Sequence, residues 1–260
     1  MSNDGAVHLQ IEGPIASVTF DRPEARNAMT WAMYQQLRAH CEKLRELEET
    51  VRVVRFQGAG GEAFVAGTDI AQFQDFQSGK DGVEYEHRID GSMQLLAALP
   101  MPTVAVVQGW CVGGGLAIAT TCDFRIATPA TKFGVPIART LGNCLSMANV
   151  AALVAAFGRP RVQRLLLLAD LIGAEEAQAC GYVLEVAAPE QIEAAAQKLC
   201  TKLAGLAPIT QAVSKEALSR LLRHSLPEAE DLIRRTYGSE DFREGVQAFV
   251  GKRPPVWKGL

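Results

Sequence analysis

Two glycine-containing segments of this sequence place small residues where the backbone could approach a ligand. The first, residues 64–70, contains Gly67-Thr68, and the second, residues 109–115, ends in three consecutive glycines. Free N–H groups at a helix start carry partial positive charge, and glycine has no Cβ to keep an oxygen atom away. Two such bends side by side would form an oxyanion hole. A triple glycine is also typical of a tight turn under close packing, so spacing alone leaves both interpretations open.

Other common catalytic motifs are absent from the sequence. It contains no GxxxxGK[ST] phosphate loop, no GxGxxG after a strand, no GxSxG nucleophile turn and no HExxH metal pair. The four histidines are far apart in the sequence, and we interpret them as surface or hydrogen-bonded residues. The six cysteines lie in apolar contexts without CxxC spacing, which indicates reduced thiols rather than a disulfide framework. We therefore expect no metal site.

The elements that would hold the two bends alternate along the first half of the chain. Strands are predicted where apolar and β-branched residues gather between turns, over residues 7–11, 15–20, 51–56, 103–107 and 123–127. Thr30 can cap a helix that continues to about residue 49, and Asp69 could cap another over residues 70–76. A short buried helix is predicted over residues 116–121. Strands alternating with helices favour an α/β fold with right-handed crossovers.

The second half of the chain is mostly helical. Helices are predicted over residues 151–157, 161–168, 174–179, 191–203, 211–222 and 228–237. Their apolar stripes, such as Ile192, Ala196 and Leu199, must pack on the α/β core or meet another subunit. Because no Ser- or Pro-rich linker precedes them, we expect these helices to be docked rather than tethered.

Composition limits the class of protein. The chain has 260 residues, of which 48% are hydrophobic and 21% charged, enough apolar material for one large domain. The net charge of −3 and the lack of a long basic run argue against nucleic acid as a partner. No apolar run reaches the roughly 18 residues of a membrane span, and residues 1–5 show no targeting signal. We expect a cytoplasmic protein without a membrane partner.

Several segments, in order along the chain, resemble the enoyl-CoA hydratase/isomerase (crotonase) superfamily. They are residues 22–28 (RPEARNA), residues 64–70 (FVAGTDI), Gly109 with residues 113–115, Cys122-Asp123, and residues 133–136 (FGVP). The resemblance runs from about residue 7 to residue 181. It implies an α/β fold with a crotonase-like spiral of ββα turns over residues 1–200. A C-terminal helical oligomerisation region, residues 201–260, would then form homotrimers that often pair into homohexamers.

The resemblance also implies a ligand and a site. The ligand would be an acyl-CoA thioester, with coenzyme A as part of the substrate and no separate cofactor. The thioester oxygen would accept hydrogen bonds from the backbone N–H groups of Thr68 and Gly114, and Arg26 would reach the phosphates. The residues implied to line the substrate are Ala25, Arg26, Asn27, Ala28, Ala66, Thr68, Asp69, Ile70, Ala71 and Gly114.

The sequence departs from the hydratase pattern at both proton-carrying positions. In hydratases one glutamate stands two residues after the triple glycine and a second follows the Phe-Gly-x-Pro segment. Ala117 and Ile137 occupy these positions here, and neither side chain can move a proton. Shifting the alignment by one residue brings only Leu116 and Ala138.

Some other residues are replacement candidates. Arg139, beside Asn143 and Cys144, could bind a carboxylate on the acyl group, although a salt bridge across a subunit interface is the stronger interpretation. We interpret Thr68 chiefly as a backbone donor and Asp69 as a helix cap rather than a base. A helical segment that often borders the pocket in this family is expected to present a solvated charged face. It contains Glu84, Tyr85, Glu86 and His87.

The function predicted from these observations is an enzyme of this superfamily acting on acyl-CoA thioesters, as in fatty acid metabolism. Fixed N–H donors stabilise the enolate, or the related oxyanion, formed in hydration, isomerisation, decarboxylation or hydrolysis, but they do not select among these reactions. With both usual glutamates missing, a lyase or an isomerase is the first expectation. The alternative is a non-catalytic acyl-CoA-binding protein of the same fold, since fold alone does not fix function.

Overall fold

A six-stranded sheet forms the centre of the computed structural model, which describes residues 4–224, 226 and 228–259. The first three residues of the segment predicted to lack a targeting signal lie outside these ranges. The strand order is β1-β2-β3-β5-β7-β10. The first two predicted strands, β1 (Ala6–Glu12) and β2 (Ile15–Asp21), form an antiparallel hairpin. Parallel strands follow: β3 (Val53–Gly58), β5 (Thr103–Val107), β7 (Phe124–Ala127) and β10 (Glu185–Val186).

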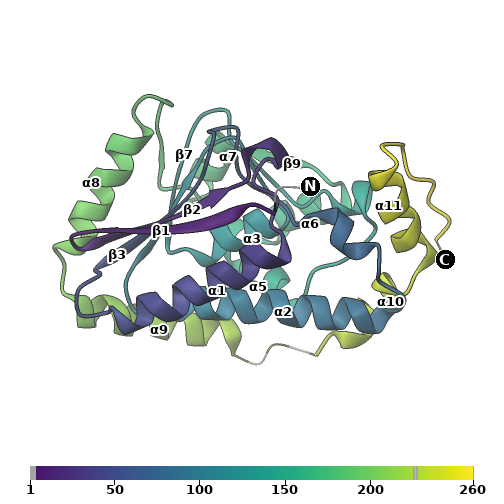
Figure 1. Cartoon of the computed structure of the whole chain (residues 1–260), viewed down its shortest axis with the longest axis horizontal. Coiled ribbons are helices and arrows are strands. Elements are labelled where there is room, and N and C mark those ends of the chain that lie inside the picture. Colours follow the sequence, from purple (N-terminus) through teal and green to yellow (C-terminus); the bar gives the residue numbers. More distant parts are fainter. Residues whose placement is uncertain (1–3, 225, 227, 260) are drawn as a thin grey trace.

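The central strand β5 consists almost entirely of apolar residues. All five of its residues are buried, because helices cover both faces of the sheet. Side chains of a strand alternate between the two faces. Val104 and Val106 therefore pack against α8 (Ile192–Ala204), whereas Ala105 and Val107 face the main core, to which α1 contributes. In Figure 1, α8 and α1 lie on opposite sides of the sheet.

A second, four-stranded sheet was not predicted from the sequence. Its order is β4 (Ala63–Ala66), β6 (Trp110–Val112), β8 (Lys132–Gly134) and β9 (Leu171–Gly173). The first three strands are parallel, and β9 is antiparallel to β8. Each strand has only three or four residues, too few for an alternating pattern to stand out from its surroundings. This small sheet carries the two glycine bends.

The helices of the first half start at the predicted caps. Thr30 accepts a hydrogen bond from the Met33 amide and begins α1 (Trp31–Glu46), which ends earlier than residue 49. Asp69 accepts from the Ala71 amide but starts only the short 3₁₀ helix η2 (Ile70–Phe73). The other helical elements here are η1 (Pro23–Ala25), α2 (Gly79–Ala97), which runs beside α1 in Figure 1, and α3 (Gly114–Thr121).

The C-terminal half is helical, as predicted, with two further helices. The predicted ones are α5 (Met147–Phe157), α6 (Arg159–Leu167), α7 (Ala174–Ala179), α8, α9 (Pro208–Arg223) and α10 (Glu230–Tyr237). The additional ones are α4 (Ile137–Thr140) and α11 (Glu240–Val250). Ile233, Tyr237 and Phe242 pack with Val83 of α2, so α10 and α11 are docked on the core. The predicted division between residues 200 and 201 falls inside α8.

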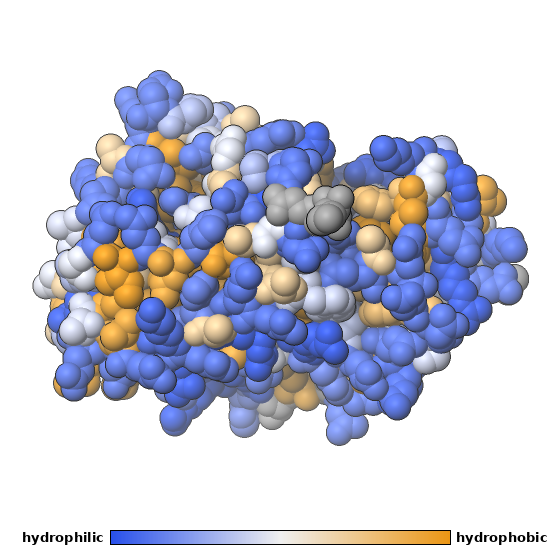
Figure 2. All heavy atoms as spheres, viewed as in Figure 1, coloured by the Kyte–Doolittle hydropathy of each residue, from blue (hydrophilic) through white to orange (hydrophobic). Residues whose placement is uncertain are grey.

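The surface is mainly hydrophilic on the face shown in Figure 2, with an apolar patch over the ends of β1 and β3 that lie at the left of Figure 1. Among the helices of the described ranges, none combines the length and the hydropathy that crossing a membrane requires.

Candidate active site

The small sheet brings the two glycine bends together. β4 and β6 are parallel neighbours, with Ala66 opposite Val112. Continuing this register two residues past the carboxyl ends of both strands places Thr68 beside Gly114. The spacing agrees, because a Cβ built on Gly114 would lie 3.3 Å from Thr68 Oγ1, and one built on Gly113 would lie 3.4 Å from the Gly67 Cα. Residues 46 positions apart in the sequence thus meet at one edge of the sheet.

Two of the glycines are required by the local geometry. Gly113 has φ of +53°, a left-handed conformation that residues with a Cβ rarely adopt. Gly114 is the first residue of α3, and a Cβ there would lie 2.5 Å from the Tyr34 hydroxyl oxygen. The triple glycine therefore does pack tightly, and the same bend leaves the start of α3 open.

The amides of Thr68 and Gly114 have no acceptor in the described part of the chain. Around Thr68, the Met29 amide donates to the Gly67 carbonyl and the Asp69 amide donates to the Met29 carbonyl, both at 2.9 Å. The Thr68 amide lies between these two hydrogen bonds and takes part in neither. The Gly114 amide is free because the first N–H groups of a helix have no carbonyl one turn earlier. Both donors are available to an external oxygen atom.

Both bends open onto one cavity of about 900 Å³, within the range of small-molecule sites. Most of the predicted ligand-lining residues are found in its wall: Ala25, Arg26, Ala28, Ala66, Thr68, Asp69, Ile70 and Gly114. Ala71, also predicted, is exposed and is not part of the wall. In a 3₁₀ helix residues i and i+3 share a face. Ile70 and Phe73 take the cavity face of η2, which turns Ala71 away.

The loop at residues 25–28 is held by a fully buried asparagine. Asn27 donates from Nδ2 to the carbonyls of Ala59 and Ala63, at 2.9 and 2.8 Å, and accepts from the Arg22 amide. This anchor places Arg26 at the cavity wall, where it pairs with Glu62 at 2.8 Å. Both side chains of that pair are more than half exposed, so a phosphate could replace the carboxylate at small cost.

The structure can be compared with the roles suggested for Asp69 and Arg139. Asp69 does act as a cap, and its other carboxylate oxygen pairs with Arg22 at 2.8 Å. The suggestion that Arg139 binds a carboxylate in the pocket is not supported, because Arg139 is exposed and lies outside the cavity wall. It belongs to α4, whose Ile137 and Thr140 face the cavity. Arg139 lies between these two residues in the turn, so its side chain points away from the cavity.

Two apolar residues, Ala117 and Ile137, stand where the resemblance predicts the glutamates of a hydratase. Both line the cavity wall. Asn143 lines it as well, whereas Cys144 does not. The Asn143 amide nitrogen donates to the Tyr237 hydroxyl at 3.2 Å, and its oxygen is buried without a partner in the described part of the chain.

Glu86 is a functional candidate that sequence reasoning undervalued. Its side chain was expected on a solvated face, but the residue is only 2% exposed and lines the cavity. One carboxylate oxygen accepts from the Tyr237 hydroxyl at 2.7 Å and the other from the Ser146 amide at 2.9 Å. Burial raises the pKa of Glu86 from 4.5 to about 7, and these two hydrogen bonds oppose the rise. Glu84 and His87 are exposed, as predicted.

The sequence did contain a signal for the burial of Glu86. Val83, Glu86 and Ile89 follow one another at intervals of three residues, which keeps them on one face of α2. Val83 and Ile89 are typical core residues, so the helical period alone predicts that Glu86 points inward with them.

The Thr68 side chain forms hydrogen bonds with two tyrosines. Thr68 Oγ1 shares hydrogen bonds with the Tyr34 hydroxyl at 2.9 Å and with the Tyr85 hydroxyl at 3.1 Å. Burial raises the pKa of Tyr34 to about 12 and that of Tyr85 well above its usual value, so both stay protonated at neutral pH. The hydrogen bonds among these three hydroxyl groups hold the bend in place. The backbone amide of Thr68 is not used by them.

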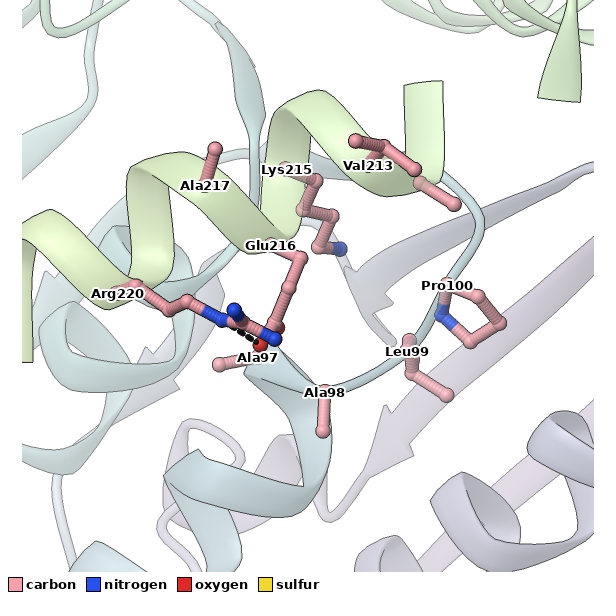
Figure 3. Close-up of a pocket in the computed structure, with 10 residues that line it drawn as sticks. Ala97, Ala98, Leu99, Pro100, Val213, Lys215, Glu216, Ala217 and Arg220 are labelled. Atoms are coloured by element: carbon pink, nitrogen blue, oxygen red, sulfur yellow. Dashed lines mark hydrogen bonds and ion pairs between the residues drawn. The ribbon is translucent and has the colours of Figure 1, made fainter. Parts of the chain in front are cut away.

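A second cavity, of about 460 Å³, lies between residues 97–100 and α9 (Figure 3). Alanine, leucine, proline and valine form most of its wall. Its charged side chains are already paired, Glu216 with Arg220 at 2.8 Å and Lys215 with Asp123 at 2.8 Å.

Comparison with known proteins agrees with this fold. A family model described as enoyl-CoA hydratase/isomerase matches residues 10–260. A probable enoyl-CoA hydratase of Rhizobium meliloti is 32% identical, over 96% of each chain. The 1,2-epoxyphenylacetyl-CoA isomerase of Escherichia coli is 32% identical, over 96% of this chain and 97% of its own. A structure of methylmalonyl-CoA decarboxylase complexed with 2S-carboxypropyl-CoA matches with a TM-score of 0.86 at 25% identity, over 98% of both chains.

The fold is that of the crotonase superfamily, as the sequence motifs predicted. Within that class, the chain belongs to the enoyl-CoA hydratase/isomerase family.

Proposed function

We propose that the chain is an enzyme that acts on acyl-CoA thioesters through an enolate, or a related oxyanion, held by the Thr68 and Gly114 amides. The single observation that carries this proposal is the pair of free amides, in register at the carboxyl ends of β4 and β6 and open to one cavity. Two donors focused on one point would also bind the thioester oxygen in the ground state. In a reaction, such donors stabilise charge that develops on the thioester oxygen.

The wall of the cavity favours a reaction that needs no pair of water-activating acids. Ala117 and Ile137 offer neither of the carboxylates that hydration uses. Isomerisation and decarboxylation need the enolate but not an activated water, and the relatives named above include an isomerase and a decarboxylase. We therefore place an isomerase, or a lyase that decarboxylates its substrate, ahead of a hydratase. Arg26, with Ala25 and Ala28, would contact the coenzyme A portion.

The proposal is tested by incubating the full-length protein with enoyl-, hydroxyacyl- and malonyl-type CoA esters in deuterated water. We expect deuterium at the α carbon, or a new product, for at least one ester. Mass spectrometry of the recovered esters measures both. Tight binding of the esters without exchange or turnover would instead establish the alternative, a non-catalytic acyl-CoA-binding protein.

We also propose that the C-terminal helical region, residues 201–260, joins chains into homotrimers that can pair into hexamers of a cytoplasmic enzyme. In support, α9 buries none of its residues within the chain. Its Ile209, Val213, Leu218 and Leu221 are between 64% and 77% exposed, unusual for large apolar side chains on one helix.

Light scattering at micromolar concentration checks the assembly. We expect a mass of three or six chains for the native protein. Leu221→Lys should shift the mass towards the single chain, because it places a charge within the apolar surface of α9. Lys198→Leu on α8, outside that surface, serves as the control and should leave the mass unchanged. A monomeric native protein would refute the assembly but leave the proposed chemistry open.

A further inference from the structure

The cavity has no glutamate at either position expected from the hydratase pattern, but it does hold a carboxylate on another element. Glu86 reaches the cavity from α2, and it shares that wall with Ala117 and Ile137. The next residue back along α2, Tyr85, shares a hydrogen bond with Thr68 Oγ1 at 3.1 Å. Glu86 is therefore adjacent in the chain to a residue that touches one of the two bends.

Hydrogen bonds hold the Glu86 carboxyl group in place, but no neighbouring cation among the described residues compensates its negative charge. Tyr237 and the Ser146 amide each donate one hydrogen bond, although an ionised carboxylate can accept about four. The titratable groups around it are Asp90 and Tyr85 on α2, Tyr34 on α1, Tyr237 on α10 and Cys144 before α5. None of these is a cation, and no ion pair joins Glu86 to a basic side chain in the described ranges.

A buried carboxyl group without a cationic partner is costly to ionise, and its proton is held near neutral pH. A group that exchanges its proton close to the working pH is best suited to general acid–base catalysis. A purely structural tie between α2, α10 and the loop before α5 would not need an ionisable residue, because a glutamine could make both contacts.

We propose that Glu86 is the acid–base residue of this site and takes over the proton transfer of the two missing glutamates. This inference rests on the proposed function. The Cα–H bond of the acyl group breaks, and the proton passes to a Glu86 carboxylate oxygen. The electron pair of that bond forms the carbon–carbon double bond of the enolate, while the thioester oxygen takes the negative charge and is held by the Thr68 and Gly114 amides. Return of the proton to carbon regenerates the carboxylate, so no further reagent is consumed.

The experiment compares α-deuterium exchange into a saturated acyl-CoA ester and its 3-enoyl analogue by the native protein, Glu86→Gln and Glu84→Gln. Glutamine can still accept from the Ser146 amide and donate to the Tyr237 oxygen, so the fold should persist. Glu84 is an exposed glutamate on the same helix and provides the matched control. We expect Glu86→Gln to lower exchange by about 10²–10⁴-fold and Glu84→Gln to leave it unchanged. Calorimetry should show equal ester binding in all three.

The pH profile gives a second and independent measurement. Glu86 must be ionised to accept the proton, so native exchange should rise with pH through about 7 and then level off. Tyr237→Phe removes a hydrogen bond that favours the ionised form, and it should move this midpoint to higher pH without abolishing exchange. A role confined to structure would change stability but not the midpoint.

The outcomes separate the two proposals. Exchange by Glu86→Gln within tenfold of the native rate would overturn the role of Glu86 and leave the proposed function standing. Should that variant fail to fold, a native profile that is flat between about pH 6 and 8 would overturn it as well. A native protein that binds the esters but neither exchanges nor converts them would refute both.

Discussion

Replacing Gly114 by proline should lower kcat/KM for an acyl-CoA ester by about 10²–10³-fold, the loss seen when one oxyanion donor is removed. Proline has no N–H, and its ring would stand where the thioester oxygen is expected to bind. Because Gly114 is the first residue of α3, where proline is well tolerated, the helix should still form. Steady-state kinetics on the ester identified by the exchange assay provides the measurement.

A steric effect of the new Cβ must be separated from loss of the amide. A Cβ at position 114 would meet the Tyr34 hydroxyl oxygen, so both variants are made in a Tyr34→Phe background. Gly114→Ala in that background adds a Cβ but keeps the N–H, whereas Gly114→Pro also removes the N–H. We expect the alanine variant to retain at least tenfold more activity than the proline variant. Equal activities would show that the Gly114 amide does not stabilise the reaction.

Asp123→Ala should lower the free energy of unfolding by about 3–5 kcal/mol, because it removes both the ion-pair partner of Lys215 and the acceptor of two hydrogen bonds from Thr103. Asp123 Oδ2 accepts from the Thr103 amide, the Thr103 hydroxyl and Lys215 Nζ at 2.7–2.8 Å. Alanine leaves Lys215 without its carboxylate and the fully buried Thr103 without an acceptor for its amide. The two charged side chains are 12% and 25% exposed, which places the loss towards the lower end of that range.

Urea unfolding at one protein concentration measures this loss as a change of midpoint at constant slope. The matched control is Lys215→Met, which removes the cation but leaves Asp123 with both Thr103 donors. Its loss should be clearly smaller, because no buried donor is left unpaired. Equal losses in the two variants would mean that the ion pair between β7 and α9, and not the bonds to Thr103, carries the stabilisation.

Local patterns in the sequence were sufficient for many individual elements. Strand β5 and helix α7 were predicted with their observed bounds, because an uninterrupted β-branched run and a short helical stretch between clear breakers need only local information. The Thr30 and Asp69 caps were predicted for the same reason, since a side chain that accepts from an amide two or three residues later acts within one turn. Strands of three residues, such as β6 and β8, gave no such signal.

The cavity wall was predicted less completely than the elements. Ala71 was expected in the wall, and Arg139 was considered there beside the stronger interpretation of an interface salt bridge, because of their positions in motifs. The orientation of each is set by a short helical turn. Glu86 was expected in solvent because its neighbours Glu84 and His87 are polar, although its burial depends on α10 and on the Ser146 loop packing over α2. These partners are 60 and 151 residues away. The helical period of α2 does indicate that Glu86 points inward, but the distant partners that bury it are not visible in a local pattern.

By itself, the sequence determined the two glycine bends, the family they indicate, and the apolar residues Ala117 and Ile137 where the resemblance predicts glutamates, since each is a matter of residue type at a motif position. Only the tertiary structure decided that the bends meet. The parallel register of β4 with β6 sets Thr68 beside Gly114, and hydrogen bonds between distant strands establish that register. Tertiary packing also decided that Glu86 of α2 is a buried carboxyl group in the cavity wall, because the burial of a side chain depends on all the elements that pack around it.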